Sequence, residues 1–67
     1  MDTSEPKPTS RELVDFLLAK GESPESISAA TGAHWRTVYR WKNGDDALPP
    51  YYRALHETAV AAGFGTT

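Results

Sequence analysis

The chain contains no cysteine among its 67 residues. It therefore has neither disulfides nor the cysteine-rich zinc sites that hold many small domains together. The two histidines, His34 and His56, lie too far apart in the sequence to suggest a metal cluster. A chain this short also buries little surface. We expect a single domain that is stabilised by helix packing or by a second copy of the chain.

Long apolar runs are also missing. No stretch approaches the roughly 20 apolar residues that a membrane-spanning helix requires. The first ten residues, MDTSEPKPTS, have neither the basic nor the apolar region of a signal peptide. We therefore expect a cytoplasmic protein that does not enter the membrane.

The motifs of catalysis are absent as well. The sequence has no nucleophile–base arrangement, no metal-ligand spacing and no glycine-rich phosphate loop. We therefore expect no catalytic residues, no metal and no other cofactor, and we expect no small-molecule ligand. A binding protein is favoured over an enzyme.

Positive charge is scarce overall but concentrated in one place. Seven Lys and Arg stand against nine Asp and Glu, for a net charge of −2. Three of the seven, Arg36, Arg40 and Lys42, fall between residues 33 and 44, where no acid occurs. Association with a polyanion depends on the local field at the contact face more than on net charge. This segment is either a basic amphipathic core helix or a surface for a polyanion, whose binding would be sensitive to salt.

Helix signals begin after a polar start. Residues 1–8 contain two prolines and almost nothing apolar, so we expect a disordered leader. Thr9 and Glu12 match the capping box of a helix start. The following RELVDFLLAK has apolar residues at helical spacing, and Gly21 stands where a left-handed residue would end the helix.

Two short helices are predicted next. Ser23 and Pro24 suit the cap and the first turn of a helix that faces inward through Ile27 and Ala30, and Gly32 ends it. A third helix is expected from about residue 34 to 42, ended by the Asn-Gly pair at 43–44.

The fourth helix is predicted to begin near Pro49 and to end at Gly63, with Leu55, Ala59 and Ala62 facing inward. Residues 64–67 are expected to form a flexible tail. No segment has the alternating pattern of a strand. The sequence therefore predicts an all-α fold, a compact bundle of four or five short helices within a domain at 9–63.

The third helix has two chemically different sides. At about 100° per residue, Val38 and Trp41 face inward and Thr37 lies at the edge of the buried side. His34 stands at the N-terminus, as a cap or a base contact, and Trp35 lies at the border. The outer side then carries Arg36, Tyr39, Arg40 and Asn43.

These outward residue types suit DNA. Arginine donates two hydrogen bonds to guanine N7 and O6, and a helix fits the major groove. Asn, His and Thr side chains donate or accept hydrogen bonds, and Tyr39 and Trp35 offer apolar contact to a thymine methyl group. The acids Asp45 and Asp46 follow directly; we expect them to form a turn and cap, and to repel wrong DNA registers.

Residues 23–44, SPESISAATGAHWRTVYRWKNG, resemble the helix–turn–helix of the lambda-repressor-like and Cro-like family of phage and bacterial regulators. The TVYRW string at 37–41 is typical of such proteins. The resemblance extends over 10–63. Pro24 and Trp35 depart from the Gln or small polar residues that the family often has in the first turns. The matching positions are Ser28, Gly32, Val38 and Trp41.

The resemblance implies a homodimer that binds a palindromic operator in double-stranded DNA and regulates transcription, most simply as a repressor. Two copies of helix 34–42 would enter major grooves about 34 Å apart. Carried over by position, the base-reading residues are His34, Trp35, Arg36, Thr37, Tyr39 and Arg40. The phosphate-contacting residues are Ser23, Lys42, Asn43, Tyr51 and Tyr52.

Dimer contacts are expected from the last helix and the tail, with Leu55, His56, Val60 and Phe64 as candidates.

The competing hypothesis is a protein-interaction module, such as an antitoxin-like protein or an adaptor, that uses the same helical fold. An acidic surface with aromatics at Trp35, Tyr51 and Tyr52 would suit it. An antitoxin could bind both DNA and protein.

Overall fold

Four helices form the protein in the computed structural model, which describes residues 7–65. They are α1 (Ser10–Ala19), α2 (Pro24–Thr31), α3 (Trp35–Lys42) and α4 (Pro49–Ala61). No strand occurs within this range. The predicted all-α fold and the four predicted helices are therefore confirmed.

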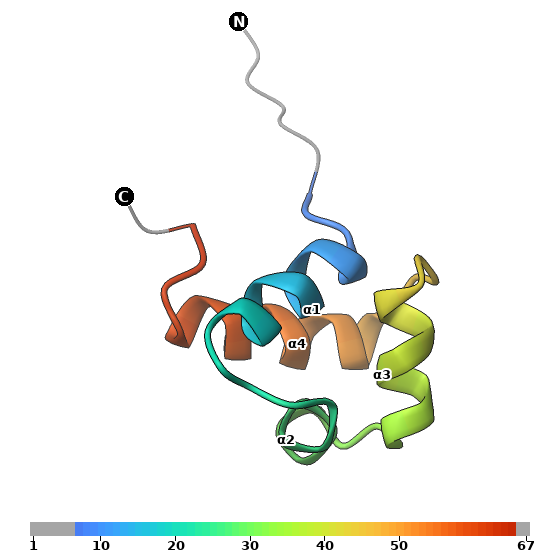
Figure 1. The fold of residues 1–67 in the computed structure, drawn as a ribbon. Coiled ribbons are helices and arrows are strands. Elements are labelled where there is room, and N and C mark those ends of the chain that lie inside the picture. Colours follow the sequence, from blue (N-terminus) through green and yellow to red (C-terminus); the bar gives the residue numbers. More distant parts are fainter. Residues whose placement is uncertain (1–6, 66–67) are drawn as a thin grey trace, which may run out of the picture.

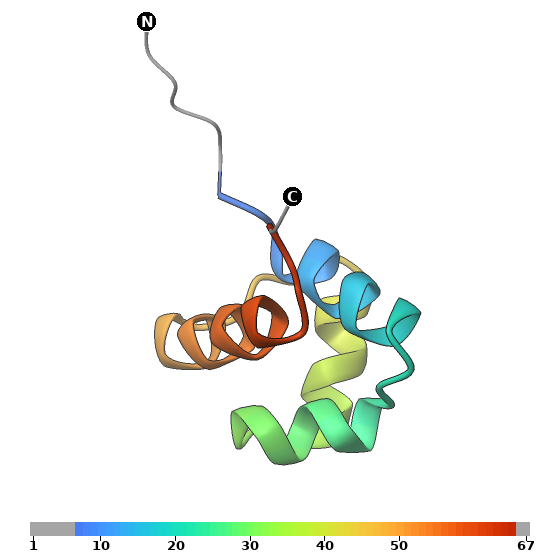
Figure 2. The ribbon, with the colours of Figure 1, turned by 90° about the vertical axis from the view of Figure 1, so that its left-hand side faces the viewer.

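Helices α1 and α2 each pack against both α3 and α4. Figure 1 views α2 nearly end-on while α3 rises beside it, so the axes of these two helices cross steeply. In the second view, α1 and α4 lie together above α2 (Figure 2). This arrangement leaves one long side of α3 without a covering helix.

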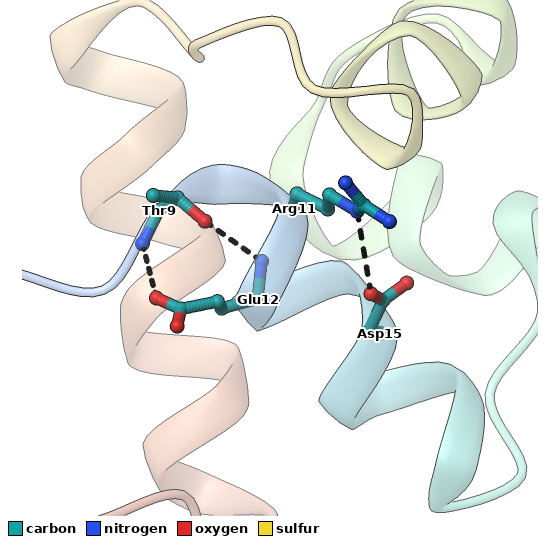
Figure 3. A network of polar contacts seen from close by, with 4 residues as sticks. All are labelled: Thr9, Arg11, Glu12 and Asp15. Carbon is teal, nitrogen blue, oxygen red and sulfur yellow. Dashed lines mark hydrogen bonds and ion pairs between the residues drawn. The ribbon is translucent and has the colours of Figure 1, made fainter.

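Local capping explains where α1 begins. The Thr9 hydroxyl accepts a hydrogen bond from the Glu12 N–H at 3.1 Å, and the Glu12 carboxylate accepts one from the Thr9 N–H at 2.8 Å (Figure 3). The predicted capping box is thus confirmed, because both orphan donors are satisfied. At the other end Gly21, at φ +98°, donates to Leu18, and Glu22 donates to Leu17, as in a Schellman motif.

The core lies where the four helices meet. Ile27 of α2 belongs to it, but Ala30 is exposed, so the prediction that Ala30 faces inward is wrong. Thr31 is buried instead, and its hydroxyl donates to the Ile27 carbonyl at 2.9 Å, which removes the cost of burying that polar group. The buried apolar side chains are Leu13, Val14, Leu17, Ile27, Ala33, Val38, Trp41, Leu55 and Ala59.

A long-range hydrogen bond links the α3–α4 connection to the start of α1. The buried Ser10 hydroxyl accepts from the Ala47 N–H at 2.8 Å, across 37 positions of sequence. No residue pattern indicates this contact. It fixes the segment that follows α3 against the core.

Both ends of the described chain are anchored more closely than the sequence suggests. The Tyr52 hydroxyl donates to the Pro8 carbonyl at 2.6 Å, so residue 8 of the predicted leader is held against α4. The ring of Phe64, assigned to the tail, lies 5.1 Å from that of Phe16 in an edge-to-face contact. Pro8 and Phe64 therefore belong to the packed domain. Residues 1–6 and 66–67, which make up most of the predicted leader and half of the predicted tail, lie outside the described residues.

Gly32 lies in the turn that joins α2 to α3, and its replacement tests why a glycine stands there. Its φ is +81°, and an added Cβ would meet nothing within 4 Å. Gly32→Ala should therefore lower the free energy of unfolding by about 1–2 kcal/mol through backbone strain alone, as measured by chemical denaturation. Gly32→Asn should lose less, since Asn adopts the left-handed conformation more readily. Equal losses in the two variants would contradict this explanation.

Candidate nucleic-acid interface

The two sides of α3 are separated as the helical period predicts. Val38 and Trp41 are buried, and Thr37 is half-buried at the edge. Every other side chain from residue 34 to residue 43 is exposed, and we call this set the α3 outer face: His34, Trp35, Arg36, Tyr39, Arg40, Lys42 and Asn43. Of the predicted base-reading residues, only Thr37 is partly covered.

An aromatic cluster occupies the N-terminal half of the α3 outer face. The rings of Trp35 and Tyr39 lie 5.7 Å apart and nearly perpendicular, at 86°. The Arg36 guanidinium lies 5.5 Å from the Trp35 ring, and the His34 ring lies 5.4 Å from it. Trp35 and Tyr39 are each 44% exposed. Two large rings, each in contact with a neighbour, thus remain open to solvent beside a cation.

His34 has a structural role. Its Nδ1 accepts a hydrogen bond from the Arg36 N–H at 3.1 Å and so caps α3. Of the two roles predicted for His34, the structure shows the cap. A contact to a base would have to use the other ring nitrogen, Nε2.

The C-terminal half of the face carries an ion pair that the sequence analysis missed. Arg40 Nε lies 3.4 Å from Asp45 Oδ2. Five positions separate the two residues, whereas side chains three or four positions apart are neighbours on a helix. The contact arises because the chain reverses at Gly44, whose φ is +114°. The Asn-Gly pair that ends the helix was the signal available in the sequence.

The predicted phosphate contacts do not form one set. Lys42 and Asn43 are exposed on the α3 outer face. Ser23 caps α2 by accepting from the Ser26 N–H at 3.1 Å, and the carboxylate of Glu22 accepts from the Ser26 hydroxyl. With Glu25 in the first turn as well, the start of α2 is acidic, which weakens its attraction for a phosphate.

Tyr51 and Tyr52 point to different neighbours. The half-buried Tyr51 ring lies 6.1 Å from the Trp41 ring, which keeps it near α3. The Tyr52 ring stacks against His56, and its hydroxyl donates to Pro8. The one hydrogen of the Tyr52 hydroxyl is thus directed to Pro8 in this structure, and the phosphate contact of Tyr52 stays a prediction.

Burial, together with the negative charge of Glu12, raises the pKa of Tyr52 above its usual value near 10. A raised pKa in the folded state stabilises the fold below the unfolded pKa, and that contribution is lost as the pH rises through the folded value. We expect stability to fall more steeply above pH 10 in the wild type than in Tyr52→Phe. Denaturation curves at pH 9 to 12 test this, with the exposed Tyr39→Phe as the control. Parallel curves for wild type and Tyr52→Phe would contradict it.

The four residues predicted to form dimer contacts differ in how far they are exposed to solvent. Leu55 is fully buried within the single chain, so the prediction that it contacts a second copy is wrong. His56 and Phe64 are half-buried, with their rings 6.4 Å apart. Val60 is exposed. Leu48, which the sequence analysis did not select, is 66% exposed at the start of α4.

No group of three or more His, Cys, Asp or Glu side chains is placed to hold a metal between residues 7 and 65. None of the four helices is long and apolar enough to cross a bilayer. No protein-family model matches the sequence, and no curated protein or solved structure is significantly similar to it.

Proposed function

We propose that this protein is a sequence-specific DNA-binding regulator of transcription, in which α2 and α3 act as a helix–turn–helix and α3 enters the major groove. The observation that carries the proposal is the α3 outer face. It places two arginines, a lysine and an asparagine on an exposed helix side that contains no acid between residues 33 and 44. Arginine and asparagine are the side chains best suited to the edges of guanine and adenine.

The connection between α2 and α3 supports the same proposal. Three residues, 32–34, join the two helices, and one of them is a glycine in the left-handed conformation. Helix–turn–helix units use turns of this length, often with glycine. The Ser28 hydroxyl donates to the Ala33 carbonyl, which ties α2 to the turn. This hydrogen bond and the burial of Val38 and Trp41 hold the α3 outer face in a fixed orientation.

The proposed mechanism is occlusion by a homodimer. Two copies would place their α3 helices in major grooves about 34 Å apart, one helical turn of DNA. The operator would be a palindrome. Because Leu55 is buried, the exposed Val60 and Leu48 replace it as the apolar candidates for the dimer contact.

Selection of bound duplexes from a random DNA pool tests this function. Enrichment of a palindrome whose half-sites lie about one helical turn apart is the expected result. Binding should weaken steeply with salt, since each phosphate contact releases a counterion. If no duplex is enriched even at low salt, the proposal is wrong.

A protein partner for the same surface is the competing proposal, which the exposed rings of Trp35 and Tyr39 favour. The two proposals differ in their salt response and in their dependence on Arg36 and Arg40. Binding to a partner through aromatic contacts should change little with ionic strength, because apolar contacts are not screened by salt.

A further inference from the structure

Trp35 and Arg36 form a contact pair at the start of the α3 outer face. The Arg36 guanidinium lies 5.5 Å from the centre of the Trp35 ring, a distance at which the ring quadrupole attracts a cation. Arg36 makes none of the ion pairs found among residues 7–65, whereas Arg40 pairs with Asp45. Within this part of the chain, the partner of the Arg36 cation is thus the Trp35 ring.

The Trp35 ring is itself supported from one side. The Tyr39 ring, about one helical turn further along α3, meets it edge-to-face at 5.7 Å and 86°. Trp35 nevertheless remains 44% exposed, so much of its apolar surface is open to a ligand. A ring that is already ordered loses little conformational entropy when a partner covers it.

The contact with Trp35 can be kept when Arg36 binds DNA. A guanidinium has five N–H donors, and guanine N7 and O6 take two of them. The attraction of the ring acts on the positive charge and needs no carboxylate. Arg36 therefore meets a guanine without first giving up its partner, and the Trp35 ring enters the groove beside the same base.

The distance between the ring and the cation limits which bases the ring can reach. Successive base pairs are about 3.4 Å apart along the DNA axis. A ring 5.5 Å from the guanidinium therefore lies within about two base pairs of the guanine that Arg36 binds. In the major groove, the apolar group that a base offers is the C5-methyl group of thymine. The base 5-methylcytosine carries a methyl group on the same carbon.

We propose that Trp35 and Arg36 together read one composite element: a guanine with a C5-methylated pyrimidine, thymine or 5-methylcytosine, within two base pairs of it. The inference rests on the proposed DNA binding and names a part of the operator. The contact between the ring and the methyl group forms only where the sequence supplies that group beside the guanine. It therefore raises the affinity for the operator above that for random DNA.

The guanine is located first, by repeating the selection of bound duplexes with Arg36→Ala. This variant should relax the base preference at one position of each half-site, and the base preferred there by the wild type should be guanine. We expect the wild-type operator to contain a thymine within two base pairs of that guanine.

Replacing that thymine by uracil removes the methyl group and keeps every hydrogen-bonding atom of the base. In one half-site, the replacement should lower the affinity of the wild type about twofold to fourfold, the effect of burying up to one methyl group. Cytosine and 5-methylcytosine at the same position should differ by a similar factor, in favour of the methylated base.

Variants of the protein assign the effect to Trp35. In Trp35→Ala, duplexes with thymine and with uracil should bind alike, because the group that contacts the methyl is gone. Trp35→Phe keeps a ring and should retain part of the difference. Val60→Ala is the matched control: it removes exposed apolar surface on α4 and should leave the ratio of thymine to uracil affinity as in the wild type.

The outcomes separate the inference from the function on which it rests. A wild-type protein that binds no duplex contradicts the proposed function before any base is replaced. If an operator is selected but Arg36→Ala affects no guanine, or no thymine lies within two base pairs of it, the inference is overturned. A loss below about twofold with uracil overturns it as well, and so does an equal loss in Trp35→Ala. The comparison of thymine with uracil in the wild type decides even if Trp35→Ala does not fold.

Discussion

Arg36→Ala together with Arg40→Ala is expected to abolish sequence-specific DNA binding. Each two-bond contact to guanine contributes about 1–3 kcal/mol of discrimination, so the loss of both, about 2 kcal/mol or more, should lower operator affinity at least about 30-fold. Both side chains are exposed and neither contributes to the core. The fold should therefore survive, and the loss will be in binding. Titration of the selected operator and of a random duplex measures it.

Arg53→Ala is the control for the arginine variants. Arg53 is exposed on α4 and pairs with Glu57 at 3.9 Å, away from the α3 outer face. Its replacement removes one positive charge and should change operator affinity by less than about twofold at physiological salt, since distant charges are screened. Comparable losses for Arg53→Ala and for each single arginine variant of α3 would show that net charge, not base reading, governs binding.

Leu55→Ala is expected to have the largest effect on stability. Leu55 is fully buried in the core, and truncation of a buried leucine costs about 2–5 kcal/mol. A domain of this size is stabilised by roughly 3–10 kcal/mol in total. The variant should therefore be largely unfolded or should melt at a much lower temperature, as circular dichroism will show.

The same experiment distinguishes a core residue from a dimer contact. A loss caused by a missing core side chain does not depend on protein concentration, whereas a loss at a dimer interface does. We expect the loss of stability from wild type to Leu55→Ala to be the same over a wide range of protein concentration. Glu57→Ala is the control, since Glu57 is exposed on the same helix and its truncation should change stability by less than about 0.5 kcal/mol. If Leu55→Ala is as stable as Glu57→Ala, the core assignment is wrong.

The competing forces at the α3 outer face explain how an acidic chain can serve as a DNA reader under the proposed function. The net charge of −2 opposes approach to DNA at long range. At contact, the outer face presents Arg36, Arg40 and Lys42, and Asp45 partly neutralises one of them. Weak binding to random DNA is then compatible with selective binding to an operator, because base contacts add to a small electrostatic term.

Most of the secondary structure was predictable because its signals are local. The capping box at Thr9 and Glu12 and the left-handed residues Gly21 and Gly32 act within a few residues of the helix ends. The separation of Val38 and Trp41 from the α3 outer face follows from the helical period alone. The exposure of the predicted base-reading residues was therefore largely predictable, although their contact with DNA stays a prediction.

The inward side of α2 was predicted wrongly and the Arg40–Asp45 ion pair was not predicted, each for a physical reason. Thr31, not Ala30, lies in the core because Ile27 and Thr31, four positions apart, share the buried side of α2, and the Ile27 carbonyl satisfies the Thr31 hydroxyl. Ala30 was predicted to face inward because alanine is more apolar than the threonine at position 31. Asp45 escaped notice as a partner of Arg40 because a turn, not a helix, brings them together.

By itself, the sequence determined the all-α class, the approximate limits of the helices and the chemical character of the α3 outer face, since these depend on interactions between residues close in the chain. Only the tertiary structure decided that Leu55 lies in the core, that Tyr52 binds Pro8 and that Ser10 holds Ala47. Each of these depends on which side of a helix its neighbours cover. Residues more than 35 positions apart make the two hydrogen bonds, and no local pattern encodes such a pairing.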